Sequence, residues 1–425
     1  MTSPHPPMLM HAEPKIPTTP LHKLVEARRV TTHFQPIFSV RRRSVVGMEA
    51  LSRGVEDGGG LIPPTSMFEM AAAEGLADVV EDLCRSSAVR TFSRLPSRSD
   101  DLLLFLNLDL VSTATPEASA AQLQTLVYGA GLEPRNVAVE FLEARFDDAG
   151  RFGALATALR GRGFLMALDD VGAGHSNLDR IPLLRPDILK IDRSLITGVE
   201  GDFYKQETLK SLVSLSRRIG ALVVAEGIET EAEAITALGL GADLLQGYFL
   251  SRPQAATTFD ADGMERAATC VESLARAFKS HTVGEINERK LAYRRFNEIL
   301  ARILGELASA DAAEFDAILT RVIDEDPKVE CVYVLDEAGI QVTDTICNAG
   351  MARRPGGAMF RPAAKGTDHS FKEYFYLLVD VELQKYTTDP YVSLASGHLC
   401  RTISTQLRDA ASDRRYVLCV DIRPG

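Results

Sequence analysis

The sequence predicts an α/β protein: a (β/α)8 TIM-like barrel with an antiparallel first strand, followed by a smaller α+β domain. Before about Pro253, eight short apolar runs alternate with helical stretches rich in Ala, Leu and Arg, and eight is the number of strands that such a barrel needs. Only SVRRRS (39–44) separates the first two runs, which is too short for a crossover helix. After Pro253 this alternation stops, which indicates a second domain.

The predicted barrel strands follow one another along the chain at 33–38, 45–48, 102–106, 137–139, 164–168, 188–191, 222–225 and 244–245. The first two form an antiparallel hairpin, and we interpret Arg41–Arg43 as its solvated tip. Helical stretches separate the later runs, so we expect those strands to be parallel.

The second domain is predicted to begin with a long helix. Apolar residues recur at helical spacing between 262 and 325, at Phe296, Ile299, Leu300, Ile303, Leu304 and Leu307. This stripe needs a partner surface, which is either its own C-terminal domain or a second copy of the chain; both alternatives stay open here. Alternating runs at 329–345 and 414–422 then predict strands, which makes this domain α+β.

Composition narrows the class of protein. A chain of 425 residues exceeds the size at which a single core stops growing, so we expect at least two domains. The net charge of −11 disfavours a DNA or RNA polymer as partner but allows a small anion held by metal ions. No apolar run is long enough to span a membrane, and the six scattered cysteines favour reduced thiols in a cytoplasmic protein.

We therefore expect four segments. Residues 1–20 are rich in proline and are predicted to be a disordered tail. Residues 21–257 are predicted to form the barrel, 258–284 a helical linker, and 285–425 the α+β domain.

Polar residues follow each predicted barrel strand. In a β/α barrel the carboxyl ends of the strands meet at one mouth, where active sites of this fold lie. A single acidic residue at such a position is most often a helix cap, but the complete series is a hard-oxygen ligand set suited to Mg²⁺ or Mn²⁺. Two such ions side by side are used to cleave phosphodiesters. The series is Glu49, Asn107, Glu140, Asp169, Asp170, Lys190, Asp192, Glu226 and Gln246.

These residues carry a resemblance to a known family. The segments MEALSR (48–53), NLD (107–109), VEFLE (139–143), LDDVGAG (168–174), LKIDR (189–193), VVAEGIET (223–230) and LLQGYFLSRP (244–253) resemble the motifs of EAL-domain cyclic di-GMP phosphodiesterases. The resemblance spans about residues 21–257 and implies hydrolysis of cyclic di-GMP to linear pGpG with two divalent cations, Mg²⁺ or Mn²⁺.

The resemblance also implies residue roles. One cation would be held by Glu49, Asn107, Glu140 and Asp169, and the other by Asp169, Asp170 and Glu226. Lys190 would orient the attacking water, Gln246 would support that water or the second cation, and Glu143 would brace the loop after Asp170. Substrate contacts would come from Gln35, Leu51 and Arg53, with Asp192 behind the cation ligands.

The loop after the two aspartates departs from the family pattern, because Val171 and Ala173 replace a usual Phe and Thr. Gly172 and Gly174 are retained, and they allow a sharp turn beside the site. Neither changed residue is a ligand in the implied scheme, so the departure bears on turnover and dimer coupling rather than on metal binding.

The C-terminal part resembles a PAS/Cache-like sensor domain in the segments 360–376, 386–404 and 416–422. We expect an unknown small-molecule signal there. Polar candidates for a ligand pocket are Arg361, Lys365, Asp368, His369, Tyr391 and Arg401, although each alone is more often a surface or core hydrogen-bonding residue. His369 and His398 lack metal-ligand spacing.

The leading hypothesis is thus a cyclic di-GMP phosphodiesterase, forming a homodimer and regulated by its C-terminal domain. An alternative is a receptor that binds cyclic di-GMP without cleaving it, which normally requires lost metal ligands. A third possibility, compatible with the first, is that the C-terminal domain only dimerises the barrel.

Overall fold

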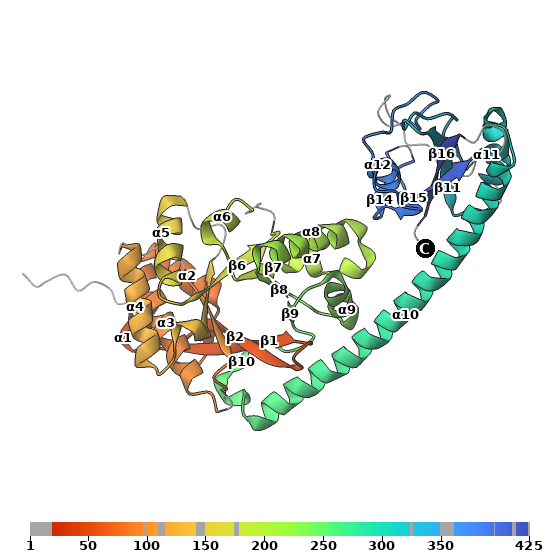
Figure 1. Ribbon diagram of the computed structural model, residues 1–425. Coiled ribbons are helices and arrows are strands. Elements are labelled where there is room, and N and C mark those ends of the chain that lie inside the picture. The colour runs from red at the N-terminus through yellow and green to blue at the C-terminus, as the bar shows by residue number, and fades with distance from the viewer. Residues whose placement is uncertain are drawn as a thin grey trace, which may run out of the picture. The chain divides into compact units, whose positions relative to one another are not determined.

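The structure is a computed structural model that describes residues 19–96, 98–108, 115–141, 149–173, 178–323, 326–348, 361–394, 396–409 and 414–423. These residues fall into two compact units divided between Val283 and Gly284 (Figure 1). The predicted tail lies outside the described residues except for Thr19 and Pro20, at the start of α1 (Pro20–Glu26).

The first unit is a closed barrel with one reversed strand. Its strands are β1 (Val30–Ser39), β2 (Ser44–Val55), β4 (Leu103–Asn107), β5 (Val137–Phe141), β6 (Leu165–Val171), β7 (Ile188–Ile191), β8 (Leu222–Ala225) and β9 (Leu244–Leu245). They pair in the ring β1-β2-β4-β5-β6-β7-β8-β9-β1. β1 is antiparallel to both β2 and β9, and the other neighbours are parallel. The predicted fold class is confirmed.

Helices surround this barrel (Figure 1). They are α2 (Pro64–Ala73), α3 (Ala77–Ser93), α4 (Pro116–Gly129), α5 (Ala149–Arg160), α6 (Ile181–Leu184), α7 (Arg193–Ile196), α8 (Phe203–Ile219) and α9 (Glu231–Leu240), with 3-10 turns η1 (Pro134–Asn136), η3 (Val199–Gly201) and η4 (Ala256–Thr258). Short strands β3 (Leu61–Ile62) and β10 (Gln254–Ala255) extend the sheet beside β2 and β1. The apolar core therefore has two layers, one between strands and helices and one inside the barrel.

The 48-residue helix α10 (Ala261–Ala308) contributes to both units. Near its beginning, Val271 and Leu274 are buried in the core of the barrel unit. Towards its end, Ile299 and Ile303 are buried together with residues of α11 (Phe315–Ile323), which follows the 3-10 turn η5 (Ala312–Glu314). The predicted apolar stripe therefore packs on its own C-terminal domain, which was one of the two open alternatives.

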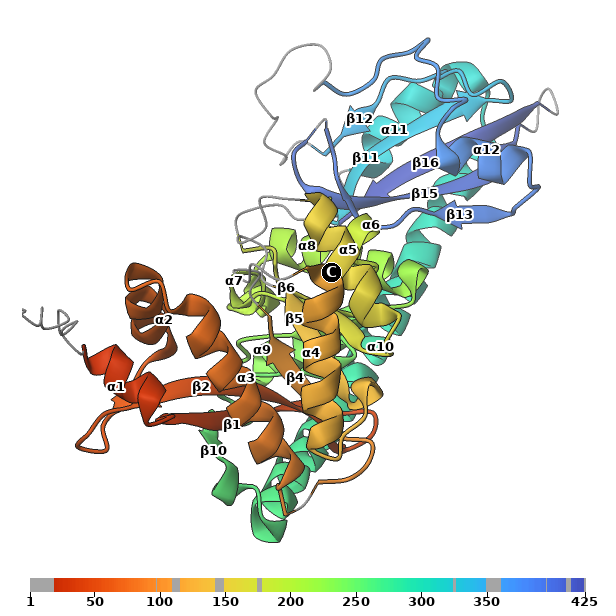
Figure 2. The same cartoon turned by 90° about the vertical axis from the view of Figure 1, so that its left-hand side faces the viewer.

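The second unit is an antiparallel sheet with helices on both faces (Figure 2). Its strands are β11 (Val329–Asp336), β12 (Ile346–Cys347), β13 (Lys385–Thr387), β14 (Tyr391–Val392), β15 (Leu399–Arg408) and β16 (Arg415–Ile422). The order is β12-β11-β16-β15-β13, and β14 pairs with β15. α10 and α11 pack on one face and α12 (Glu373–Val379) on the other, so the α+β prediction is confirmed.

The prediction that all cysteines are reduced is wrong for one pair. Cys331 and Cys347 form a disulfide between β11 and β12, with Cα atoms 4.1 Å apart. They face each other directly in the antiparallel register, although they lie 16 residues apart in the chain. Spacing along the sequence could not reveal this pair, because strand pairing brings the two thiols together.

Candidate active site at the barrel mouth

The alternation of side chains along each strand places the polar series in one mouth. Residues two apart in a strand share a face, and the inward apolar residue of each parallel strand is followed two positions later by a polar residue. Gly47 takes the inward position on β2, where a Cβ would lie 2.4 Å from the Phe105 ring. The pairs are Gly47 and Glu49, Phe105 and Asn107, Ala138 and Glu140, Ala167 and Asp169, Ile188 and Lys190, Val224 and Glu226, and Leu244 and Gln246.

Lys190 is the centre of this site. Its Nζ lies 2.6 Å from Glu140 Oε1, 2.7 Å from Glu226 Oε1, 3.2 Å from Asp169 Oδ1 and 3.4 Å from Glu49 Oε2. Its side chain is only 1% exposed. Burial lowers the pKa of Lys190, but the surrounding carboxylates raise it well above its ordinary value, so the lysine is a buried ammonium group.

The carboxylates of the site outnumber its one positively charged side chain, Lys190. Burial raises the pKa of Glu140, Asp169 and Glu226, although Lys190 acts in the opposite direction. Burial and the neighbouring Asp169 raise the pKa of Asp170 to about 6. When ionised, these four residues and Glu49 together with Lys190 have a formal charge of −4, which equals in size the charge of two divalent cations.

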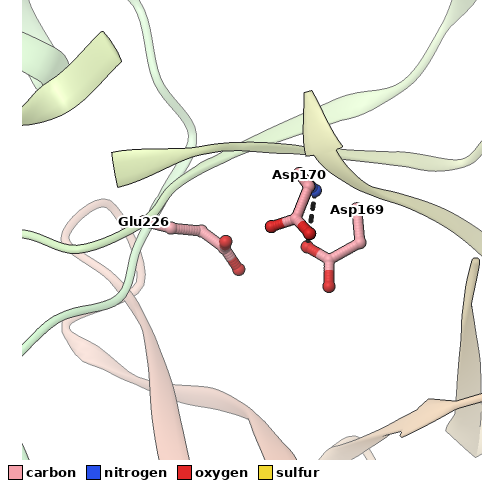
Figure 3. Close-up of side chains that lie close together, drawn as sticks. All are labelled: Asp169, Asp170 and Glu226. Atoms are coloured by element: carbon pink, nitrogen blue, oxygen red, sulfur yellow. Dashed lines mark hydrogen bonds between the residues drawn. The ribbon is translucent and has the colours of Figure 1, made fainter. Parts of the chain in front are cut away.

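Asp169, Asp170 and Glu226 form the tightest acidic group among the described residues, with one oxygen of each within 4.8 Å of the others (Figure 3). The backbone at Asp170 is left-handed, with φ of +53°, and the β6–β7 register shifts between Leu168 and Val171. Asp170 N donates to Asp169 Oδ1 at 2.9 Å. This irregular turn brings two consecutive carboxylates to one place, which a regular strand does not do.

Other oxygens of the site also suit a cation. The buried atoms Glu140 Oε2 and Gln246 Oε1 have no hydrogen-bond donor within the described part of the chain. Gln246 Nε2 donates to Glu49 and, at 3.3 Å, to Gln35 Oε1, while Gln35 Nε2 donates to Ser251 O. Asn107 pairs with Glu140 in the β4–β5 register. The residues present therefore fit oxygen-coordinated divalent ions.

The predicted substrate-binding residues lie in different surroundings. Leu51 and Asn107 line a cavity of about 490 Å³ between β2, α2 and α3. Arg53 is half-buried, and burial lowers its pKa. Asp192 caps α7 by accepting from Ser194 N at 2.9 Å, and it adds to the raised pKa of Asp170. Its predicted role, behind the cation ligands at the substrate site, stays a prediction.

Two predicted features of neighbouring loops have different outcomes. Gly172 has φ of +102°, and a Cβ there would lie 2.3 Å from Leu195 Cδ1, so glycine is required at this turn. Val171 is buried in the core at the position of the usual Phe. Glu143 and Gly174 lie outside the described residues, so their predicted roles are untested.

Sequence reasoning missed Glu233, which supports the site. It is only 3% exposed and accepts from the backbone N–H groups of Gly198, Glu229 and Thr230. Thr230 accepts in turn from Glu233 N, which completes a capping box at the start of α9. The Thr-x-x-Glu spacing was the available signal, and the contact with Gly198 was not predictable from it.

The polar candidates of the second unit have mostly structural surroundings. His369 is buried between Tyr374 OH, at 2.7 Å, and Gln341 Oε1, at 2.9 Å, and burial lowers its pKa. Tyr391 OH contacts Thr402 Oγ1 at 2.7 Å. The remaining candidates, Arg361, Lys365, Asp368 and Arg401, are exposed.

Fold and site together define a β/α-barrel protein with an acidic, cation-fitting site at its mouth. The chain belongs to the EAL domain family, whose model matches residues 20–253. It is 26% identical to the uncharacterized EAL-domain containing protein YkuI of Bacillus subtilis, over 92% of this chain and 94% of that protein. It is 29% identical to the probable cyclic di-GMP phosphodiesterase PdeB of Escherichia coli, over 55% of this chain and 45% of PdeB.

The fold has a counterpart over nearly the whole chain. The crystal structure of YkuI, in complex with substrate c-di-GMP and calcium, matches with a TM-score of 0.76 at 24% identity, covering 96% of this chain and 99% of YkuI. This likeness supports the fold of both units. Among the described residues, no helix combines the length and the hydropathy needed to cross a membrane.

Proposed function

We propose that this protein is a metal-dependent phosphodiesterase that hydrolyses cyclic di-GMP to linear pGpG. The observation that carries the proposal is the buried mouth in which four carboxylates contact Lys190 and a fifth, that of Asp170, lies beside Asp169 and Glu226. Membership of the EAL family and the similarity to PdeB, which is named as a probable phosphodiesterase, support the substrate. We also infer a cytoplasmic location, where this nucleotide would be met.

The donor set supports the cation ligands that the family resemblance implies. Glu49, Asn107, Glu140 and Asp169 would hold one ion, and Asp169, Asp170 and Glu226 the other, with Mg²⁺ or Mn²⁺ suited to these oxygens. When bound, two such ions activate water and stabilise the oxygens that enter and leave phosphorus.

The chain's own residues position the reactants. Hydrolysis adds one water and breaks one P–O3′ bond, which leaves a 5′-phosphate on the linear product. The buried Lys190 ammonium offsets charge on the phosphate and orients the water, while Gln246, held by Glu49 and Gln35, limits where that water can lie. Arg53 is suited to a phosphate oxygen.

The cavity at Leu51 and Asn107 is suited to one base of the substrate. Its volume of about 490 Å³ and its apolar wall, which includes Pro64 and Phe68, match a site for a flat aromatic group. The polar side chains of Glu69 and Arg85 in the same wall supply hydrogen-bonding groups.

We further propose that the C-terminal unit regulates the barrel as a PAS/Cache-like sensor and that the protein acts as a homodimer. Continuity of α10 through both units supports a mechanical connection. A signal can alter activity only through different affinity for two arrangements of the protein.

The test is incubation of purified full-length protein with cyclic di-GMP in Mg²⁺, in Mn²⁺ and after chelation, followed by nucleotide chromatography. We expect pGpG in Mg²⁺ or Mn²⁺ and none after chelation. Ca²⁺ shares the oxygen ligands but is larger, so it should permit binding and suppress cleavage. Binding without pGpG in every metal would replace the enzyme with a receptor.

A further inference from the structure

The disulfide of the second unit lies at an edge of its sheet. In the order β12-β11-β16-β15-β13, β12 is the outermost strand, beside β11 (Figure 2). Cys331 in β11 is only 1% exposed, whereas Cys347 in β12 is half-buried. Of the two cysteines, Cys347 is therefore the one that a small molecule from solvent can reach.

The other four cysteines have different surroundings. Cys84, Cys400 and Cys419 are buried thiols. Cys270 in α10 is a half-buried thiol. Burial raises the pKa of all four, which disfavours the reactive thiolate. In the cytoplasmic location inferred above, thiols are kept reduced, and a disulfide is usually transient, with a catalytic or redox-sensing role.

Few contacts besides the disulfide hold β12 on β11. The strand has two residues, and its register with β11 covers two residue pairs, one of which is Cys331 and Cys347. Directly after the strand, Asn348 N donates to Glu330 O at 3.0 Å. Because so short a strand pair is marginally stable in water, the covalent bond contributes much of what fixes this edge.

The segment that contains β12 lies against the helices of the same unit. Asp344 N donates to Asp316 Oδ1 of α11 at 2.9 Å. Ile346 packs on the apolar core that α11 shares with Ile299 and Ile303 of α10. A displacement of β12 would therefore disturb the packing that anchors the end of α10 in the second unit.

We propose that Cys331 and Cys347 are a thiol–disulfide exchange site, that its reactant is a low-molecular-weight thiol such as glutathione, and that reduction loosens β12. In reduction, a glutathione thiolate attacks Cys347 Sγ, and the Cys331 sulfur leaves and takes up a proton. A second glutathione thiolate attacks the glutathione sulfur of this mixed disulfide and releases Cys347 as a thiol. The pair gains two electrons and two protons, and two glutathiones become one disulfide. Oxidised glutathione reverses both steps.

The experiment equilibrates full-length protein with glutathione at graded ratios of the reduced to the oxidised form. The protein is then denatured, labelled with a maleimide and weighed by mass spectrometry. We expect four labelled thiols at the oxidising end and six at the reducing end, with a reversible transition between them. A pair that stays oxidised in reduced glutathione alone, or a count of six at every ratio, would overturn the exchange site.

Hydrogen exchange measures the loosening of β12. In the reduced protein, amides of residues 345–348 should exchange about tenfold faster or more, because the disulfide no longer restrains this edge. Amides of β16, inside the same sheet, are the internal control and should keep their protection. Equal protection of residues 345–348 in both forms would overturn the loosening. Neither measurement uses a nucleotide, so the result is independent of the proposed hydrolysis.

Two variants identify the sulfurs that react. Cys347→Ser should form no internal disulfide at any glutathione ratio and should exchange hydrogen like the reduced wild type. Cys270→Ser is the matched control, because Cys270 is also half-buried but is a free thiol. It should keep the transition of the wild type. An internal disulfide in Cys347→Ser, or loss of the transition in a folded Cys270→Ser protein, would overturn the assignment to Cys331 and Cys347.

Discussion

At the scale of the residue, the site depends on carboxylates that are buried without enough positive charge. Glu140 is 0% exposed, and Lys190 is shared among four acidic partners. A buried carboxylate is unfavourable unless it is paired or coordinates an ion. The feature that is unfavourable for the barrel without a cation therefore suits the proposed binding of divalent cations.

Asp169→Asn is predicted to abolish most activity. The change removes the charge proposed to bridge two cations, and the loss of metal assistance should lower kcat about a thousandfold or more. The measurement is pGpG formation at saturating Mg²⁺. Asp243→Asn is the control, because Asp243 accepts from Val223 N at the opposite end of the barrel. A folded Asp169→Asn protein with most of its activity would contradict the two-cation assignment.

The buried carboxyl group of Asp421 should make the stability of the second unit depend on pH. Burial raises its pKa to about 7, and a hydrogen bond from Thr402 opposes this only in part. The folded state then binds a proton that the unfolded state releases near pH 4, so the contribution of Asp421 to stability is greatest below pH 4 and falls as the pH rises to about 7. Asp421→Asn should remove this dependence and gain stability relative to the wild type by roughly 1.4 kcal/mol per pH unit in that window.

The measurement is the difference in unfolding free energy between the wild type and Asp421→Asn from pH 4 to 8. Asp389→Asn, at an exposed residue of the same unit, is the control. A difference that does not change with pH would show that Asp421 is ionised in the folded protein throughout the range.

At the scale of the element, the loop between β8 and α9 joins the site to the fold. Glu226 begins this loop and Glu233 holds its end, because Glu233 accepts from Glu229 N and Thr230 N and also from Gly198 N beyond β7. Burial raises the pKa of Glu233, but these backbone donors lower it overall, so the carboxylate is held ionised. One side chain thus fixes the loops after two neighbouring strands.

Glu233→Ala should destabilise the barrel by about 2–4 kcal/mol, because three backbone N–H groups lose the buried carboxylate that accepts their hydrogen bonds. The fall in kcat should exceed what the smaller fraction of folded protein explains, because Glu226 loses its fixed position. Glu231→Ala, an exposed acid in the first turn of the same helix, is the control. Thermal unfolding and kcat at a temperature where both variants are folded would test this, and an unchanged kcat would contradict it.

At the scale of the whole molecule, the structure determines where the two units can be separated. Val271 and Leu274 of α10 belong to the core of the barrel unit, although they lie beyond residue 262. The boundary between the two compact units lies instead between Val283 and Gly284. A truncation intended to test regulation must therefore retain residues up to Val283.

A chain ending at Val283 is predicted to fold and to bind cyclic di-GMP, but to differ from the full chain in oligomeric state and in turnover. A chain ending at residue 262 is the comparison. Its free energy of unfolding should be lower by about 3 kcal/mol or more, because the apolar surface that Val271 and Leu274 cover becomes exposed. Sedimentation and pGpG formation over a range of protein concentrations would measure both effects. Equal rates and equal assembly for the full chain and the chain ending at Val283 would contradict control through assembly.

The sequence by itself determined the barrel, its reversed first strand and the order of the mouth residues. Strand alternation and connection length are local properties, and residues two apart on a strand must share a face. The tertiary structure alone decided which side chains meet: Lys190 against four carboxylates, the left-handed turn at Asp170, the contact of Glu233 with Gly198, and the Cys331–Cys347 pair. Each either joins segments that lie apart in the chain or depends on one backbone angle, and spacing along the sequence encodes neither.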